Sequence, residues 1–91
     1  MSTIYQEDEL VDVLEDSEDP RSLIVYNDDF NTFEHVINTL IKVCKHEVQQ
    51  AEQCTYIIHY RGKCAVKNGS YTHLKPMRQG IIDAGIKAAI E

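Results

Sequence analysis

The sequence predicts an α+β fold, a two-layer α/β sandwich with the element order β-α-α-β-α-β, in which three helices cover one face of a three-stranded sheet. Two observations predict it. Apolar residues recur at intervals of three and four in three stretches, which is the pattern of amphipathic helices, and three short apolar or alternating runs are typical of strands. At 91 residues, the chain is expected to form one small domain with a single core.

The first predicted strand and helix flank the sequence Asn-Asp-Asp. Residues 22–26, SLIVY, form an apolar run too short for a helix, so we expect a strand there. Asn31 or Thr32 can cap the following helix, and an Asn31 cap would place Glu34 at the third helical position, where its carboxylate complements the helix dipole. The apolar face of this helix consists of Phe33, Val36, Ile37, Leu40, Ile41 and Cys44.

A second helix is predicted after a short polar break near residues 45–46. Gly62 is expected to end it, because glycine adopts the left-handed conformation that follows many helices. Residues 63–67, KCAVK, are typical of a short strand, and Asn68-Gly69 is a strong turn signal. The apolar stripe of the second helix consists of Val48, Ala51, Thr55 and Ile58, widened by Cys54 and Ile57.

The residues after this turn signal do not alternate as a partner strand would, and they indicate a third helix instead. Thr72 is a possible cap, and Pro76 is expected in the first turn, where a missing amide hydrogen costs little. Gly85 is expected to end the helix. The helical positions are Leu74, Met77, Arg78, Ile81 and Ala84 or Gly85. A final strand is predicted from the alternation of Ile86, Ala88 and Ile90 with Lys87, Ala89 and Glu91.

The acidic residues are concentrated at the start of the chain. The net charge is -6, but residues 1–20 carry eight acids and no base, whereas residues 21–91 carry seven acids and nine bases, a net of +2. We therefore expect a flexible acidic extension over residues 1–20 and a folded domain over residues 21–91. The bases are scattered, which argues against nucleic-acid binding. With no signal peptide and no apolar run of about 18–20 residues, we expect a cytoplasmic protein without membrane contact.

The cysteines and histidines lack the spacings of metal sites, so we expect no metal and no cofactor. A thiol enzyme is an alternative, with Cys54 as the nucleophile and His59 as its base. Cys54 lies five residues before His59, however, which offsets the two side chains on a helix by more than one turn, and the expectation is a protein that is not an enzyme. The residues considered are Cys44, Cys54, Cys64, His35, His46, His59 and His73.

The Asn27-Asp28-Asp29 triplet has two interpretations. Asn and Asp bond to neighbouring backbone and are common before helices, so turn chemistry alone could explain them. Their oxygens could also accept hydrogen bonds from a positively charged ligand. A calcium site is not indicated, because the regularly spaced oxygen ligands and the closing Glu of a calcium loop are absent from the sequence.

Two longer motifs carry a resemblance to a known family. IVYNDDFNTFEHVI, followed by IIHYRGKCAV and then by G-x-YT, resembles the ClpS family of adaptor proteins over about residues 22–91, with the Asn-Asp-Asp turn and the H-x-x-G-K block about thirty residues apart. These adaptors deliver N-degron substrates, whose first residue is Leu, Phe, Tyr or Trp, to a Clp AAA+ ATPase of the ClpA or ClpC type. The resemblance implies a β-α-α-β-α-β sandwich similar to the C-terminal domain of the ribosomal stalk protein, and an N-terminal extension that engages the ATPase.

The resemblance also implies roles for individual residues. The carbonyl of Asn27, the carboxylate of Asp28 and an imidazole nitrogen of His59 would accept hydrogen bonds from the α-ammonium of a substrate, with Asp29 and Asn31 supporting the loop. The apolar first side chain would enter a pocket lined by Phe33, Val36, Thr55 and Ile86. Relatives commonly carry Met at the positions of Phe33 and Thr55. The alternatives are a protein-binding module of the same fold that does not recognise N-terminal residues, and the thiol hydrolase.

Overall fold

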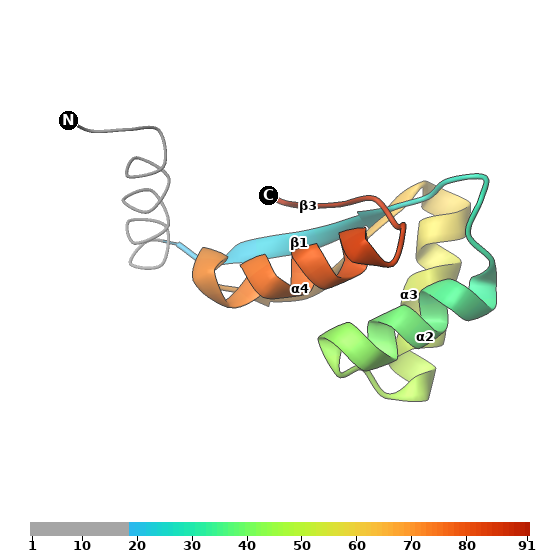
Figure 1. The fold of residues 1–91 in the computed structure, drawn as a ribbon, viewed down its shortest axis with the longest axis horizontal. Helices are drawn as coiled ribbons and strands as arrows, with labels where there is room; N and C mark the ends of the chain where they lie inside the picture. Colours follow the sequence, from blue (N-terminus) through green and yellow to red (C-terminus); the bar gives the residue numbers. More distant parts are fainter. Residues whose placement is uncertain (1–18) are drawn as a thin grey trace.

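The computed structural model describes residues 19–91, which contain three strands and three helices in the predicted order (Figure 1). The predicted α+β class and the order β-α-α-β-α-β are therefore confirmed. The expectation of a flexible extension over residues 1–20 falls almost entirely outside the described residues. The elements are β1 (Arg21–Tyr26), α2 (Phe33–Cys44), α3 (Val48–Arg61), β2 (Lys63–Gly69), α4 (Tyr71–Asp83) and β3 (Ala88–Ile90).

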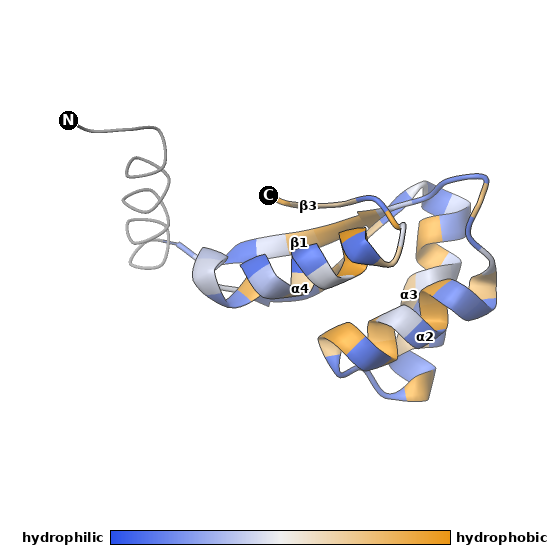
Figure 2. Cartoon of the chain, in the orientation of Figure 1, coloured by the Kyte–Doolittle hydropathy of each residue, from blue (hydrophilic) through white to orange (hydrophobic). Residues whose placement is uncertain are grey.

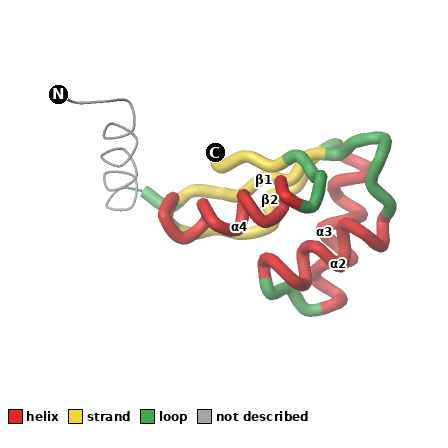
Figure 3. The backbone as a smooth tube through the Cα atoms, viewed as in Figure 1, coloured by secondary structure: helices red, strands yellow, loops and turns green. Residues whose placement is uncertain are grey.

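The sheet has the strand order β2-β1-β3 and is antiparallel throughout. β1 is central: Val25 pairs with Cys64 of β2 on one side and with Ala88 of β3 on the other, and the three strands run side by side in Figure 3. The pairing between β1 and β2 shifts register between Leu23 and Ile24. The sequence pattern alone left this strand order open, because the alternation of a strand does not identify its neighbours.

The core lies between the sheet and the helices. Leu23 and Val25 of β1 are buried, whereas their neighbours Ser22, Ile24 and Tyr26 are only partly covered, as the two-residue period of a strand requires when one face of a sheet is covered. Figure 2 shows apolar and hydrophilic residues alternating around the turns of α2 and α4. The helices contribute most of the remaining core: Val36, Leu40, Cys44, Ala51, Ile58, Leu74 and Ile81.

The helix caps decide where the loops begin. Thr32 caps α2, because its Oγ1 accepts a hydrogen bond from the backbone N–H of His35 at 3.1 Å, so of the two candidate caps Asn31 is the wrong one. Gly62 and Gly85 follow α3 and α4 with φ of 91° and 85°, in the left-handed region, as the sequence predicted.

Three details of the second half differ from the sequence prediction. Ser70 rather than Thr72 caps α4, which therefore begins at Tyr71 and has Pro76 at its sixth position instead of in its first turn. Asn68-Gly69 is not a turn: it extends β2, and the Oγ of Ser22 on β1 donates to Oδ1 of Asn68 at 2.8 Å. The last strand begins at Ala88, not at Ile86.

Candidate functional site

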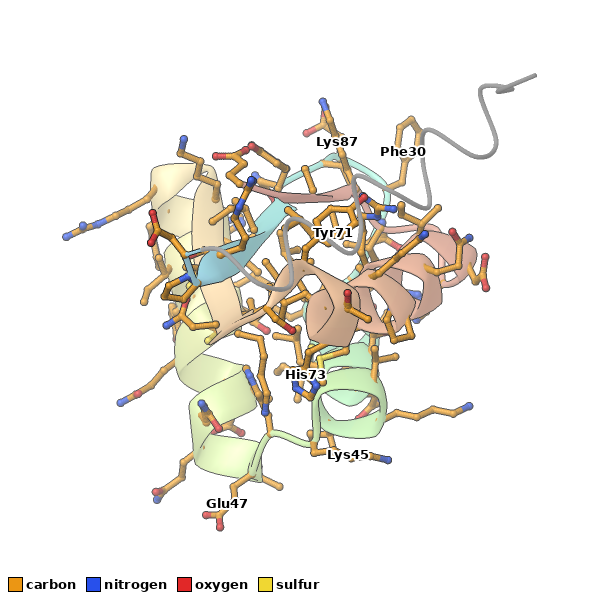
Figure 4. The ribbon with its side chains drawn as sticks, turned by 90° about the vertical axis from the view of Figure 1, so that its left-hand side faces the viewer. Phe30, Lys45, Glu47, Tyr71, His73 and Lys87 are labelled. Atoms are coloured by element: carbon orange, nitrogen blue, oxygen red, sulfur yellow. The ribbon has the colours of Figure 1, made fainter. Side chains whose placement is uncertain are left out.

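The loop between β1 and α2 is organised by the carboxylate of Asp28. Its Oδ1 accepts hydrogen bonds from the backbone N–H groups of Phe30 and Asn31, both at 2.8 Å, and its Oδ2 accepts one from Nδ2 of Asn31 at 2.6 Å. These bonds are the local Asx-turn chemistry that one interpretation of the triplet predicted. Phe30 has no place in the core: its ring is 92% exposed and points away from the helices and the sheet (Figure 4).

Two glycines at helix ends hold this loop in place. The backbone N–H of Asn27 donates to the carbonyl of Gly62, which follows α3, at 2.9 Å. The side chain of Asn31 donates to the carbonyl of Gly85, which follows α4, at 2.9 Å, in addition to its bond to Asp28. Asn31 is therefore a support of the loop, and the loop joins the ends of two helices that are distant in sequence.

The charge of Asp28 is stabilised by its donors. The pKa of the Asp28 carboxyl is held below its ordinary value of 3.8, first by the hydrogen bond from the backbone N–H of Asn31. The backbone N–H of Phe30 and the side chain of Asn31 lower this pKa further, whereas partial burial raises it. Asp28 is thus an anion at neutral pH. Asp29, the next residue, has an exposed side chain.

α3 brings His59 to the same place. His59 lies one turn after Thr55, on the same side of the helix, because residues four apart are neighbours on a helix surface. Its ring meets the ring of Phe33, the first residue of α2, edge to face, with centroids 5.0 Å apart and planes at 75°. His59 is exposed, and 38% of Phe33 is exposed, so both rings border solvent.

These groups surround an open pocket of about 350 Å³. Val36, Thr55 and Ile58 form its buried wall. The Oγ1 of Thr55 donates to the carbonyl of Ala51 at 2.7 Å, so the hydroxyl of this polar residue is already bonded within its own helix. The lining consists of Asn27, Asp28, Asp29, Asn31, Thr32, Phe33, Val36, Thr55, Ile58 and His59.

The pocket therefore brings together eight of the nine residues expected there. Ile86 is the exception: it is 3% exposed, belongs to the core cluster and does not line the pocket. Thr32 and Ile58 also line the pocket, which was not expected from the sequence. Both carried a signal, since Ile58 lies three residues after Thr55 on the same helical stripe and Thr32 was a candidate cap beside the loop.

The thiol chemistry considered for Cys54 is not supported. Burial raises the pKa of Cys54 to about 12, with a smaller effect of the neighbouring Cys64, so the thiol carries its proton at neutral pH and is a poor nucleophile. Within residues 19–91, no group of three His, Cys, Asp or Glu side chains is arranged to hold a metal ion. None of the helices in that range is both long and apolar enough to cross a membrane.

The structure is a small α+β domain with an open pocket beside the loop between β1 and α2. Residues 16–88 match the family model described as ATP-dependent Clp protease adaptor protein ClpS, and the chain belongs to this family of Clp protease adaptors. The ATP-dependent Clp protease adapter protein ClpS of Thermosynechococcus vestitus is 34% identical over 68 residues, which cover 74% of this chain and 72% of that protein. The protein of the same name from Salmonella gallinarum is 38% identical over 60 residues, which cover 62% of this chain and 57% of that protein.

Proposed function

We propose that the pocket binds the first residue of a polypeptide, with a free α-ammonium at the loop and a bulky apolar side chain against the helices, and that the chain presents such substrates to a Clp AAA+ ATPase. One observation carries the proposal: acceptors and apolar walls border one open pocket. Its lining includes the polar residues Asn27, Asp28 and His59 and the apolar residues Phe33, Val36 and Ile58. The family of Clp protease adaptors supports the delivery step.

The α-ammonium group supplies three N–H donors and a positive charge. The Asp28 carboxylate has about four acceptor positions, of which the loop occupies three, so about one remains for the ligand. The carbonyl of Asn27 and a nitrogen of His59 are the other two acceptors. Because Asp28 is anionic, its bond to the ammonium is charge-assisted and contributes about 1.5–3 kcal/mol.

The apolar part of the pocket accounts for a preference for large first residues. Its volume of about 350 Å³ lies near the lower end of the range of small-ligand pockets, roughly 300–1,000 Å³, and suits one side chain. Burying a Leu or Phe side chain there contributes about 1.5–3 kcal/mol, a contribution that Ala and Gly lack. Phe33 lines the pocket and is 38% exposed, and its phenyl ring adapts its shape less than the thioether of a Met would.

Fluorescence anisotropy with peptides that differ only at their N-terminus tests the proposal. We expect the Leu peptide to bind more than tenfold tighter than acetyl-Leu and Ala peptides, because acetylation removes a charged donor and Ala removes apolar contact. His59→Ala should specifically weaken binding of the Leu peptide. His73→Ala is a matched control, because His73 is an exposed histidine on α4 outside the pocket.

The same experiment distinguishes the alternatives. Equal affinity for Leu and acetyl-Leu peptides would contradict N-terminal recognition and would favour a protein-binding module of the same fold. Peptide turnover that disappears in Cys54→Ala would identify a thiol hydrolase instead.

A further inference from the structure

An aromatic surface extends outward from the pocket along α3. It consists of four rings that contact one another in a closed circuit: Phe33, Tyr56, Tyr60 and His59. Phe33 meets Tyr56 edge to face with centroids 5.6 Å apart, and His59 meets Tyr60 edge to face at 5.2 Å. Tyr56 and Tyr60 lie one turn apart on α3 and are stacked, with centroids 5.6 Å apart and planes inclined by only 6°.

The circuit has an inner and an outer half. Phe33 and His59 line the pocket, whereas Tyr56 and Tyr60 do not. Tyr56 is 54% exposed and Tyr60 is 74% exposed, so the outer half presents a pair of parallel rings to solvent. Single exposed apolar residues need no explanation, but two stacked rings in contact with a binding pocket form a continuous apolar surface.

The distances indicate what reaches this surface. Consecutive residues of a polypeptide are about 3.8 Å apart between Cα atoms, so a chain whose first side chain fills the pocket leaves its second side chain within a few ångströms of the pocket rim. The centroids of Tyr56 and Tyr60 are 5.6 Å and 5.2 Å from those of Phe33 and His59 at that rim. A bulky second side chain can therefore reach the two tyrosines while the first side chain stays in the pocket.

We propose that Tyr56 and Tyr60 form a second subsite, which contacts the residue after the N-terminal one and favours an aromatic side chain there. This inference rests on the proposed function. Its physical basis is that aromatic rings favour stacked and edge-to-face partners. Tyr56 and Tyr60 are exposed and already stacked on each other, so contact with them costs little side-chain entropy. The subsite ranks substrates that share the same first residue.

The test measures anisotropy with peptides beginning Leu-Phe, Leu-Ser and acetyl-Leu-Ser. In the wild type, Leu-Phe should bind about two- to tenfold tighter than Leu-Ser, the range expected from one aromatic contact. In Tyr56→Ala/Tyr60→Ala, this ratio should fall to about one by loss of that contact. Val48→Ala is the control, because Val48 is an exposed apolar residue at the other end of α3 and should leave the ratio unchanged.

The outcomes distinguish failure of the second subsite from failure of the N-terminal pocket. A wild-type ratio near one, or a ratio that the double substitution leaves unchanged, overturns the subsite while the difference between Leu-Ser and acetyl-Leu-Ser supports the pocket. Equal binding of Leu-Ser and acetyl-Leu-Ser overturns the proposed function and the subsite with it. Sedimentation velocity adds one outcome: a dimer that the double substitution dissociates, with no change in the peptide ratio, assigns the surface to a second copy of the chain.

Discussion

Asp28→Asn is the sharpest test of how the loop recognises a positive charge. Asn keeps an oxygen that can accept the bonds from the N–H groups of Phe30 and Asn31, so the turn should persist. The substituted side chain would lack the negative charge. Its NH₂ group would face Nδ2 of Asn31, which in the wild type donates a hydrogen bond to Oδ2 of Asp28. The substitution therefore separates the charge of Asp28 from its role in the turn.

The expected magnitude follows from these contacts. A charge-assisted bond to the α-ammonium becomes a neutral one, a loss of about 1–2 kcal/mol, which corresponds to roughly 5- to 30-fold weaker binding of a Leu peptide. The lost bond to Asn31 should lower the free energy of unfolding by about 0.5–1.5 kcal/mol. Anisotropy measures the first quantity and urea denaturation the second.

The acetyl-Leu peptide is the internal control, because it carries no ammonium for Asp28 to contact. Its already weak binding should not change in Asp28→Asn. Recognition of the ammonium charge by Asp28 is contradicted if the Leu peptide binds Asp28→Asn as tightly as the wild type, or if binding of both peptides weakens by the same factor.

The pH dependence of Asp28 provides a second measurement on the same group. Its pKa in the folded state lies below the ordinary 3.8, so the stability that its bonds contribute is present above that pH and is lost as the pH falls through the folded pKa. Stability of the wild type should therefore decrease more steeply on acidification below about pH 4 than stability of Asp28→Asn, which has no carboxyl to protonate.

Two further predictions concern the support of the site and the delivery step. Asn31→Ala removes side-chain bonds to Asp28 and to the carbonyl of Gly85, so urea denaturation should show a loss of about 1–2 kcal/mol and Leu peptides should bind more weakly, whereas Asn38→Ala on the exposed surface of α2 should change neither. Deletion of residues 1–20, which we propose contact the ATPase, should leave peptide affinity unchanged but slow degradation by a Clp protease; an unchanged degradation rate would contradict that role.

Local patterns predicted the elements well, because their causes are local. The period of the apolar residues from Phe33 to Cys44 defines a helix wherever it occurs, and glycine is favoured at Gly62 and Gly85 by the backbone conformation itself. The prediction was wrong where a distant part of the chain determines the local conformation. Asn68-Gly69 would turn in isolation, but pairing with Arg21 and Ser22 at the start of β1 keeps it extended.

In the candidate site, too, features with local causes could be predicted and features that depend on distant residues could not. The four-residue spacing of Thr55 and His59 placed both on one side of α3 from sequence alone. Ile86 was expected in the pocket wall from the family resemblance alone, whereas in this fold it is buried in the core two residues before the last strand begins. The bond of Asn31 to Gly85 could not be inferred, because it depends on how the elements pack. The stacking of Tyr56 on Tyr60 could not be inferred either, because it depends on the rotamers of the two side chains.

The two glycine carbonyls that hold the loop have a thermodynamic consequence. Asn27 is tied to the end of α3 and Asn31 to the end of α4, so the loop acquires its shape when the domain folds. The entropy of ordering the acceptors is then a cost of folding and not of association. A ligand entering this pocket should bind with little loss of loop entropy, and calorimetry should show a smaller entropic penalty for the wild type than for Asn31→Ala.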